Sequence, residues 1–317
     1  MKPADCFWLE PALRALRSAR RAGRLGHALL VHADPGCGGE LLATWAAQLV
    51  LCRRDDAPCG QCVDCLHCAS GQHPDLYRVQ PGGDSKQIRV EDVRDFSAEL
   101  ALTSHGGGYR VGIVTPAEAL NATAANALLK TLEEPPPRTL IVLVSAAPAR
   151  LPATIRSRCM RLRVAAPGRT ATLAWLASQG RTGDAATAAD TLGDAPLVLL
   201  EADLAEVARL RAETGSALEG VETGRVDPAQ VAERWSREDY ALRLACIEAW
   251  LGARIRLSAN ASDGNIASQF GLLDEVRGMR RDIDGPLNKS VALERWLWRL
   301  AGGGGKRAGR SPAQKGG

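Results

Sequence analysis

The sequence predicts an α/β domain with a parallel sheet, followed by an all-α region. Short apolar runs alternate with helix-forming segments in the first half, and residues 140–144 are apolar without interruption, as in a sheet covered on both faces. The last third instead has apolar residues at three- and four-residue intervals, which is typical of helices. The length of 317 residues is too great for one compact core and suits two or three domains.

The elements can be followed along the chain in order. A helix is expected near residues 11–17, with Pro11 in its first turn, and a buried strand at 28–31. A glycine-rich turn and a helix at 41–47 come next. Helical segments between the strands imply right-handed crossovers and therefore a parallel sheet. The further strands of this sheet are expected near 77–79, 110–114, 139–144 and 161–164.

The turn at residues 33–40 has the outline of a phosphate-binding loop without its chemistry. Gly36 and Gly38 stand where such a loop needs a flexible backbone, and the strand, turn and helix order is the required context. In a working loop a Lys neutralises the β- and γ-phosphates and the next Ser or Thr binds Mg²⁺. Those positions hold Gly39 and Glu40 here, so we expect no bound ATP. Taken alone, the segment also fits an ordinary glycine-rich turn.

The second half of a nucleotide site is missing as well. A nucleotidase of this type carries a strand that ends in acidic residues, which hold Mg²⁺ and orient water. The strand at 110–114 ends in Thr115 and Pro116 instead. Losses at two corresponding places predict a fold that is retained without its own catalysis.

A helix and an arginine follow this strand. Asn121 can cap a helix whose Ala- and Leu-rich interior runs to residue 134, and three prolines stop it. After the apolar strand comes the triplet at 157–159, in which Arg158 stands between Ser157 and Cys159. On the residues alone, Arg158 reads as a surface arginine at the start of a strand.

A cysteine cluster interrupts the first domain. Cys52, Cys59, Cys62 and Cys65 are separated by six, two and two residues, and Cys68 extends the series by two more. Four thiolates at such spacing form a closed, structural zinc site, although an iron–sulfur cluster also uses closely spaced cysteines. Disulfides fit poorly, because no secretory leader is seen at Met1 and the nine cysteines are an odd number. His67 and His73 are weaker ligand candidates.

Three motifs together carry a resemblance to a known family: residues 126–136, the triplet at 157–159 and the cysteine insert. The chain resembles the clamp-loader subunits of bacterial DNA polymerase III, which are AAA+ proteins. The missing lysine and acids resemble the delta-prime type, which does not hydrolyse ATP. The resemblance is specific over most of residues 1–165 and weaker to about residue 300.

The resemblance implies a domain organisation. Residues 1–165 would form the AAA+ type α/β domain, with the zinc-binding insert at 52–68. Residues 166–207 would form a small helical lid domain, and 208–301 a helical collar domain used for oligomerisation. Residues 302–317, which are basic and rich in glycine, read as a disordered tail.

The resemblance also implies site residues and partners. Arg158 would act in trans as an arginine finger in the ATP site of a neighbouring subunit. The position of the His-Pro-Asp sequence at 73–75 selects Cys59, Cys62 and Cys65 as zinc ligands, with Cys52 as the fourth and Cys68 as the spare. Partners would be gamma/tau and delta subunits in a hetero-pentamer, and through it the sliding clamp and primed DNA. Two alternatives stay open: an ATP-hydrolysing gamma/tau-type subunit, and a zinc-dependent nucleic-acid-binding protein.

Composition limits the function classes. Hydrophobic residues make up 45% and charged residues 24% of the chain, which is typical of globular proteins. No run approaches the roughly 18 apolar residues of a membrane helix, and we expect a cytoplasmic protein without membrane contact. The net charge of +4 comes entirely from the tail, because residues 1–301 contain equal numbers of basic and acidic residues. A neutral body gives little support to strong nucleic-acid binding by charge alone.

The last third predicts three helices. The first is a long helix that Ser236 would cap, the second covers 266–276 and the third 291–300. The apolar face of the long helix is formed by Tyr240, Leu244, Ile247, Leu251 and Ile255.

Overall fold

The computed structural model describes residues 3–83, 85–261, 266–283, 285 and 288–303, without the side chains of residues 260, 261 and 303. The chain divides into two compact units, and each is described by itself. Unit 1 consists of residues 1–168 together with 195–198. Unit 2 consists of residues 169–194 and of the chain from 199 onward. The α/β plus all-α composition expected from the sequence is confirmed.

Unit 1 is built on a five-stranded parallel sheet in the order β2-β3-β4-β1-β5. The central strands are buried on both faces because helices cover both, which explains the uninterrupted apolar run noted above. The register pairs Leu30 with Leu143 on one side and with Arg161 on the other. The strands are β1 (Ala28–Ala33), β2 (Leu76–Val79), β3 (Arg110–Val114), β4 (Thr139–Ser145) and β5 (Met160–Val164).

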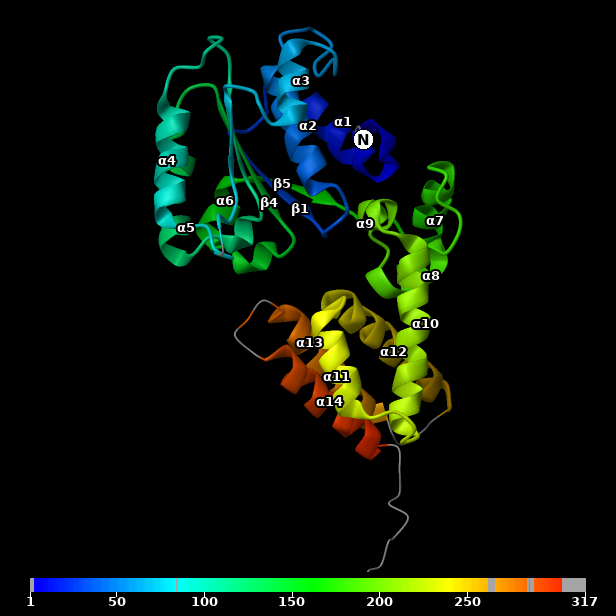
Figure 1. Ribbon diagram of the computed structural model, residues 1–317. Coiled ribbons are helices and arrows are strands. Elements are labelled where there is room, and N and C mark those ends of the chain that lie inside the picture. The colour runs from blue at the N-terminus through cyan, green and yellow to red at the C-terminus, as the bar shows by residue number, and fades with distance from the viewer. Residues whose placement is uncertain (1–2, 84, 262–265, 284, 286–287, 304–317) are drawn as a thin grey trace, which may run out of the picture. The chain divides into compact units, whose positions relative to one another are not determined.

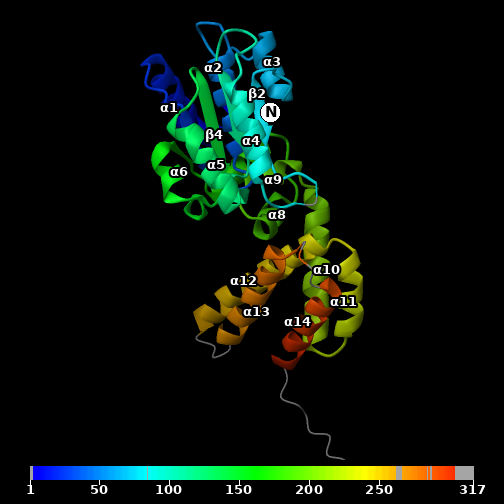
Figure 2. The same ribbon diagram turned by 90° about the vertical axis from the view of Figure 1, so that its left-hand side faces the viewer.

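Two helical layers enclose this sheet (Figures 1 and 2). On one side lie α4 (Val90–Ala101), α5 (Ala122–Glu133) and α6 (Ala153–Arg158), which share a hydrophobic core with the strands. On the other side lie α1 (Glu10–Arg21) and α2 (Gly39–Leu51), and α3 (Val63–Ser70) packs against α2. Short 3-10 helices occur at Pro3–Asp5, Phe7–Leu9, Ala117–Ala119 and Pro148–Arg150.

Sequence reasoning missed three helices of unit 1, namely α3, α4 and α6. A usable signal existed for α4, since Val93, Phe96 and Leu100 lie three and four residues apart and are buried. Asp92 also accepts a hydrogen bond from the backbone N–H of Arg89 at the start of that helix, at 2.8 Å. The eight residues of α3 and the six of α6 are too short for a periodic pattern to reveal.

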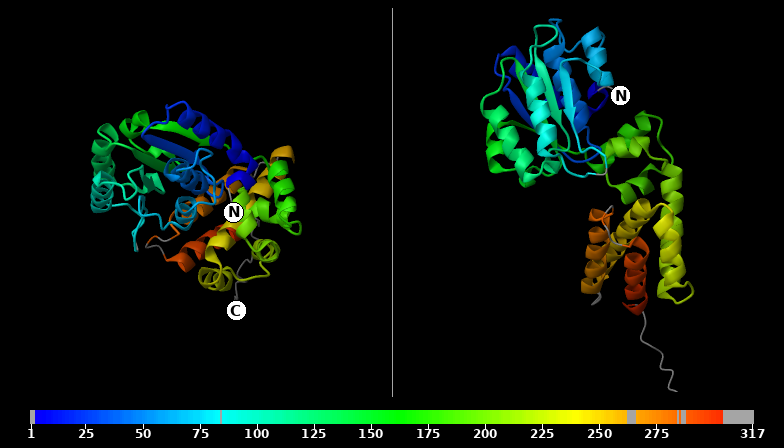
Figure 3. Two further views of the ribbon diagram at one scale, coloured as in Figure 1. Left: turned by 90° about the horizontal axis from the view of Figure 1, so that it is seen from above. Right: turned by 60° about the vertical axis from the view of Figure 1, so that its left-hand side comes forward.

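Every regular element among the described residues of unit 2 is a helix. Its main core joins α10–α14, and Figure 3 shows these helices, coloured yellow-green to red, side by side. Trp235 and Trp296 are among its largest fully buried side chains. The helices are α7 (Arg169–Ser178), α8 (Ala185–Leu192), α10 (Leu204–Glu222), α11 (Pro228–Arg237), α12 (Tyr240–Ala261), α13 (Ile266–Arg281) and α14 (Lys289–Gly303), while α9 (Pro196–Glu201) has residues in both units.

Unit 2 contradicts one expectation, the cap of the long helix, and adds facts on two others. Ser236 does not cap the long helix, because it lies inside α11 and its hydroxyl donates to the carbonyl of Glu233. The expected boundary between residues 207 and 208 lies inside α10, which is continuous across it. Helix α14 includes Gly302 and Gly303, and the rest of the expected tail, 304–317, lies outside the described residues. Among those described, no helix is both long and apolar enough to cross a membrane.

Candidate functional sites in the α/β unit

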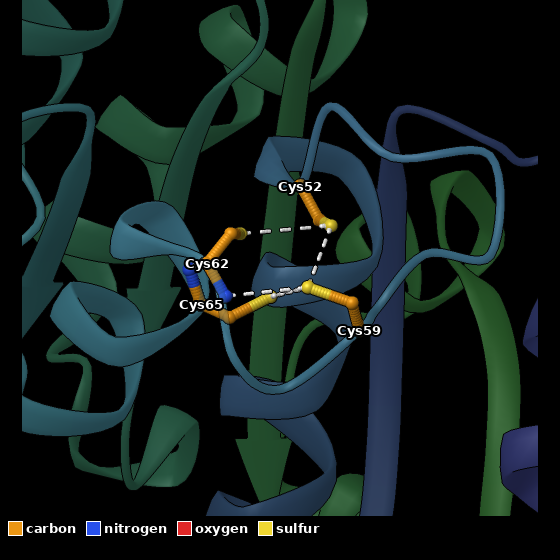
Figure 4. A group of neighbouring side chains, drawn as sticks. All are labelled: Cys52, Cys59, Cys62 and Cys65. Atoms are coloured by element: carbon orange, nitrogen blue, oxygen red, sulfur yellow. Dashed lines mark hydrogen bonds between the residues drawn. The ribbon is translucent and has the colours of Figure 1, made fainter.

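The cysteine insert brings four thiols together. Cys52 directly follows α2, Cys59 and Cys62 lie in the loop before α3, and Cys65 lies in the first turn of that helix. Their sulfur atoms point toward one another and all lie within 4.8 Å (Figure 4). Cys68 is buried on α3 but is not a member of this group. The structure thus assembles the same four cysteines that the sequence analysis selected.

The spacing of the four sulfurs matches a tetrahedral metal site. Zinc–sulfur bonds of about 2.3 Å place the corners of a tetrahedron about 3.8 Å apart. The Sγ of Cys52 lies 3.8 Å from those of Cys59 and Cys62, and Cys59 Sγ lies 4.0 Å from Cys65 Sγ. A disulfide requires an S–S distance of about 2.05 Å, and none of these four cysteines forms one. The donor set therefore fits a soft divalent cation such as zinc.

Backbone donors around the cluster favour thiolates. The N–H of Cys62 donates to Cys59 Sγ at 3.3 Å, and that of Cys65 donates to Cys62 Sγ at 3.4 Å. Backbone N–H groups of Gln61 and Cys62 lower the pKa of the Cys59 thiol to about 6. Burial raises the pKa of the Cys62 and Cys65 thiols as well as that of Cys68, the last to about 12, so the position of its sulfur and not its pKa sets Cys68 apart from the four.

Polar contacts between His73, Asp64 and Asp75 link the insert to the sheet. The His-Pro-Asp sequence before β2 supplies the link: His73 Nε2 lies 3.5 Å from Asp64 Oδ1 on α3, and the backbone N–H of Asp75 donates to His73 Nδ1 at 3.0 Å. Asp75 Oδ1 in turn accepts from the N–H of His105 at 2.9 Å and lies 3.8 Å from Nε of Arg110 at the start of β3. His73 is thus engaged by carboxylate and backbone outside the thiol cluster, which is why it is no ligand candidate here.

The degenerate nucleotide loop has closed onto the sheet. Gly38, at φ +88°, precedes α2 in a left-handed conformation that favours glycine. A Cβ at Gly39 would lie 2.9 Å from Ala33 Cβ and 2.9 Å from Val144 Cγ1, closer than such atoms pack. The position at which a nucleotidase carries its lysine therefore has no room for any side chain.

Residues of the same unit cover the loop. Leu197 donates its N–H to the carbonyl of Gly36 at 3.0 Å, and a Cβ at Gly36 would lie 2.5 Å from Val198 Cγ2. Trp8 Nε1 donates to the carbonyl of Cys37 at 2.9 Å, and Leu9 Cδ1 lies 3.2 Å from the Cβ position of Gly38. Both hydrogen bonds are accepted by loop carbonyls, so these residues crowd the loop sterically and do not occupy the backbone N–H groups that a working loop turns toward phosphates. The sequence analysis did not anticipate these four covering residues.

The two altered ends of the nucleotide site are bonded to each other. Thr115 Oγ1 donates to Glu40 Oε1 at 3.3 Å. In an active enzyme the hydroxyl follows the loop and the carboxylate follows the strand, with Mg²⁺ between them. Here the two groups have exchanged places, and a direct hydrogen bond joins them.

Arg158 ends α6 and is held by α5. Its Nη2 lies 2.6 Å from Glu133 Oε1, and its Nη1 donates to the carbonyl of Thr154 at 2.9 Å. The side chain is 35% exposed. Arg158 is a surface arginine, as the residues alone suggested, but it ends a helix, and the strand begins only at Met160. Glu133 and Arg158 lie in two of the motifs that carry the resemblance, and the sequence analysis did not predict that they pair.

Comparisons with known proteins converge on one family. The family model described as DNA polymerase III, delta subunit, matches residues 8–167. The DNA polymerase III subunit delta′ of Pseudomonas aeruginosa is 38% identical over 240 residues, which cover 74% of this chain and 72% of that protein. The subunit of the same name from Escherichia coli is 38% identical over 174 residues, or 54% of this chain and 52% of that protein. Subunit tau of Escherichia coli is 33% identical over 165 residues, which cover 51% of this chain and 25% of that protein.

Proposed function

This chain belongs to the DNA polymerase III delta-subunit family, and we propose that it is a delta-prime-type clamp-loader subunit that binds no ATP. In this role it joins gamma/tau and delta subunits in a hetero-pentamer in the cytoplasm. The complex places the sliding clamp on primed DNA during replication. Unit 1 supplies the AAA+ type domain with its parallel sheet.

The observation that carries this proposal is the closed loop. ATP binding needs a cation for the β- and γ-phosphates and open backbone donors. Position 39 has no space for a lysine, Glu40 adds a negative charge, and Leu197 and Val198 stand over Gly36. Each of these features opposes a triphosphate. An ATP-hydrolysing gamma/tau-type subunit would need a lysine at position 39, a hydroxyl at position 40 and an uncovered loop.

We further propose that Arg158 is an arginine finger for the ATP site of a neighbouring subunit. A guanidinium carries a permanent charge and presents planar donors to the oxygens of a transferring phosphoryl group. Arg158 lies at the end of a helix with its guanidinium partly exposed, and a single carboxylate, that of Glu133, holds it. A neighbour's phosphate can replace that carboxylate with little loss, because an exposed ion pair contributes only about 0–1 kcal/mol.

We propose a structural zinc ion as the cofactor of the cysteine insert. Cys52, Cys59, Cys62 and Cys65 would hold it, and the ion would cross-link a loop that has little hydrophobic core of its own. Four thiolate ligands leave no position for water or substrate, so the ion would take no part in chemistry.

Two measurements test the proposal. The isolated chain is titrated with ATP and Mg²⁺, and we expect neither binding nor hydrolysis. The chain is then reconstituted with gamma/tau and delta subunits, and DNA-stimulated ATP hydrolysis is compared between wild type, Arg158→Ala and the exposed control Arg94→Ala on α4.

We expect Arg158→Ala to assemble normally and to lower turnover at the neighbouring site by roughly 10³-fold or more. Arg158→Lys should also be impaired, because an ammonium keeps the charge but loses the forked donors. Full activity of Arg158→Ala would contradict the arginine-finger proposal. ATP hydrolysis by the isolated chain would contradict the proposal that this subunit binds no ATP.

A further inference from the structure

A group of arginines lies on unit 1 where α1 meets the loop that begins the cysteine insert. Two adjoining hollows, of about 730 and 270 Å³, share Arg17, Arg21 and Ala57 in their lining. The charged residues that line them are Arg14, Arg17, Arg20, Arg21, Arg53, Arg54, Asp55 and Asp56, which we call the arginine patch. Six arginines and two aspartates give the patch a net charge of +4, although residues 1–301 as a whole are neutral.

The sequence of α1 places this charge on one side of a helix. Leu13 and Leu16 are buried against the rest of the unit, and the arginines occupy the remaining surface. Residues 11–33 contain no acidic side chain. A helix face that is merely solvated usually carries charges of both signs, so a face with one sign only indicates an interaction surface.

Two internal contacts fix the patch without neutralising it. α1 packs beside α2 (Figure 1), and the Cζ of Arg17 lies 5.1 Å from the ring centroid of Trp45 on α2. Nη2 of Arg20 donates to the carbonyl of Cys52 at 3.5 Å, at the start of the loop that carries the other two arginines. Neither contact involves a carboxylate, so both guanidiniums keep their full charge toward solvent.

Carboxylates balance only part of the patch. Glu10 lies 3.5 Å from Arg14, and Asp64 lies 3.8 Å from Arg53. Among the residues that the structure describes, the other four arginines form no ion pair, and neither aspartate of the patch pairs with an arginine. Like charges that are gathered without counter-charges repel one another, and a bound polyanion would remove this repulsion.

A simpler explanation accounts for two of the arginines. Arg20 and Arg21 lie in the last turn of α1, where basic side chains complement the partial negative charge of the helix end. This explanation does not extend to Arg14, which lies nearer the start of the helix. It also leaves out Arg53 and Arg54, which come from another element and converge on the same hollows.

We propose that the arginine patch binds the phosphate backbone of a nucleic-acid duplex. Guanidiniums present forked donors that match phosphate oxygens, and such contacts hold a protein on a duplex without reading its sequence. No aromatic side chain lines either hollow, so the patch offers no surface on which the bases of a single strand could stack. The chemistry of the lining therefore favours a duplex, whose phosphates lie outside its stacked bases.

This proposal goes beyond the delta-prime assignment, because a surface of this one chain would hold the duplex directly, without a ring or ATP. Neither the nucleotide loop at 34–40 nor Arg158 lines the hollows. The patch is therefore separate from both nucleotide-related features of the unit.

The test measures binding of the isolated full chain to a fluorescent DNA duplex of about 20 base pairs, by anisotropy at several salt concentrations. The double variant Arg21→Gln with Arg54→Gln removes one exposed arginine from each element of the patch. The matched control is Arg94→Gln with Arg150→Gln, which removes two exposed arginines outside it. The basic residues after position 301 are the same in every variant, so their contribution cancels in the comparison.

We expect the patch variant to bind the duplex about tenfold more weakly at low salt, and the control within about twofold of wild type. The slope of log K against log salt should become shallower by about 2, because two phosphate contacts are lost. Asp56→Asn removes a carboxylate from the patch and should strengthen binding about threefold, whereas Asp95→Asn on α4 should not.

Absence of duplex binding, or equal weakening by the patch variant and its control, would overturn the proposal. A single-stranded oligothymidylate or a polyglutamate that binds the patch as tightly as the duplex would overturn it as well, since the partner would then be a single strand or an acidic polypeptide. Thermal unfolding checks that the exposed substitutions leave the fold intact. The isolated chain is used here, whereas ATP hydrolysis in the reconstituted loader tests the proposed function, so the two can fail separately.

Discussion

The cysteine insert and the degenerate nucleotide loop lie in the same unit, and both carry the outline of a ligand site, but only the insert keeps its donors in place. Its four sulfurs converge at the spacing of a tetrahedral metal site. The loop lacks the lysine of a phosphate loop and has Glu40 instead, and its backbone and glycine positions are contacted by Leu197, Val198, Trp8 and Leu9. The hydrogen bonds from Leu197 and Trp8 end on loop carbonyls, so the loop differs from the insert by the side chains packed against its glycines and by its missing lysine.

The largest expected effect comes from breaking the insert. Cys62→Ser removes one thiolate, and we expect the purified chain to fall from one zinc ion per molecule to well below half. If the ion stabilises by about 3 kcal/mol, its loss lowers the Tm of unit 1 by roughly 6–12 °C. Elemental analysis and thermal unfolding measure both quantities.

Cys68→Ala is the matched control for this prediction, because Cys68 lies on the same helix but outside the group of four. It should keep its zinc. A wild-type chain that is folded and free of metal would contradict the prediction, and a Cys68→Ala variant that loses the ion would show that the ligand set is different.

The second largest effect is expected from a loss of stability when the nucleotide loop is overpacked. Gly39→Ala inserts a methyl group 2.9 Å from Ala33 Cβ and Val144 Cγ1, and overpacking of this kind costs about 1–3 kcal/mol. Gly108→Ala is the control, since nothing lies within 4 Å of its Cβ position. Urea unfolding measures the difference, and equal stability of the two variants would mean that the loop is more open than described.

Restoring the phosphate-loop residues tests whether the missing lysine or the covering residues prevent ATP binding. Gly39→Lys combined with Glu40→Thr rebuilds the residues of a phosphate loop, yet we expect no gain in ATP binding, because the covering residues remain in place. Tight ATP binding by this double variant would show that charge alone, and not closure, silences the loop.

Thr115→Val has a smaller effect. It removes the hydroxyl that donates to Glu40 while keeping the shape of the side chain, and a net loss of about 1 kcal/mol is expected. Glu40 is exposed, so its carboxylate stays hydrated after the change. Thr115→Ser keeps the donor and should unfold at nearly the urea concentration of the wild type, apart from the loss of one methyl group.

The smallest change in stability is expected from breaking the ion pair between Glu133 and Arg158. Glu133→Gln removes the carboxylate that holds the guanidinium and should change the free energy of unfolding by less than about 1 kcal/mol, because both side chains are partly exposed. In the reconstituted loader this variant should retain most of the ATP hydrolysis that Arg158→Ala loses. A loss as severe as that of Arg158→Ala would show that Glu133 itself is needed at the neighbouring site.

Local patterns predicted much of unit 1 and less of unit 2. The strands and the helix capped by Asn121 followed from apolar runs and from capping and stop residues, which act over a few positions. The short helices α3 and α6 did not, because one or two turns leave no period to detect. Ser236 was assigned to the wrong helix for a related reason: α11 and α12 are separated only by Glu238 and Asp239, and both flanking segments favour helix.

What the sequence determined by itself was chemical identity: four thiols at short spacing, no lysine or hydroxyl in the loop, no acid directly at the end of β3, and an arginine between Ser157 and Cys159. Tertiary structure alone decided which groups meet. It brought Cys52 and not Cys68 to the other three cysteines, placed Leu197 over Gly36, and paired Glu40 with Thr115. The physical reason is that spacing along the chain governs contacts within one or two turns, whereas these partners are brought together by the packing of separate elements around the sheet.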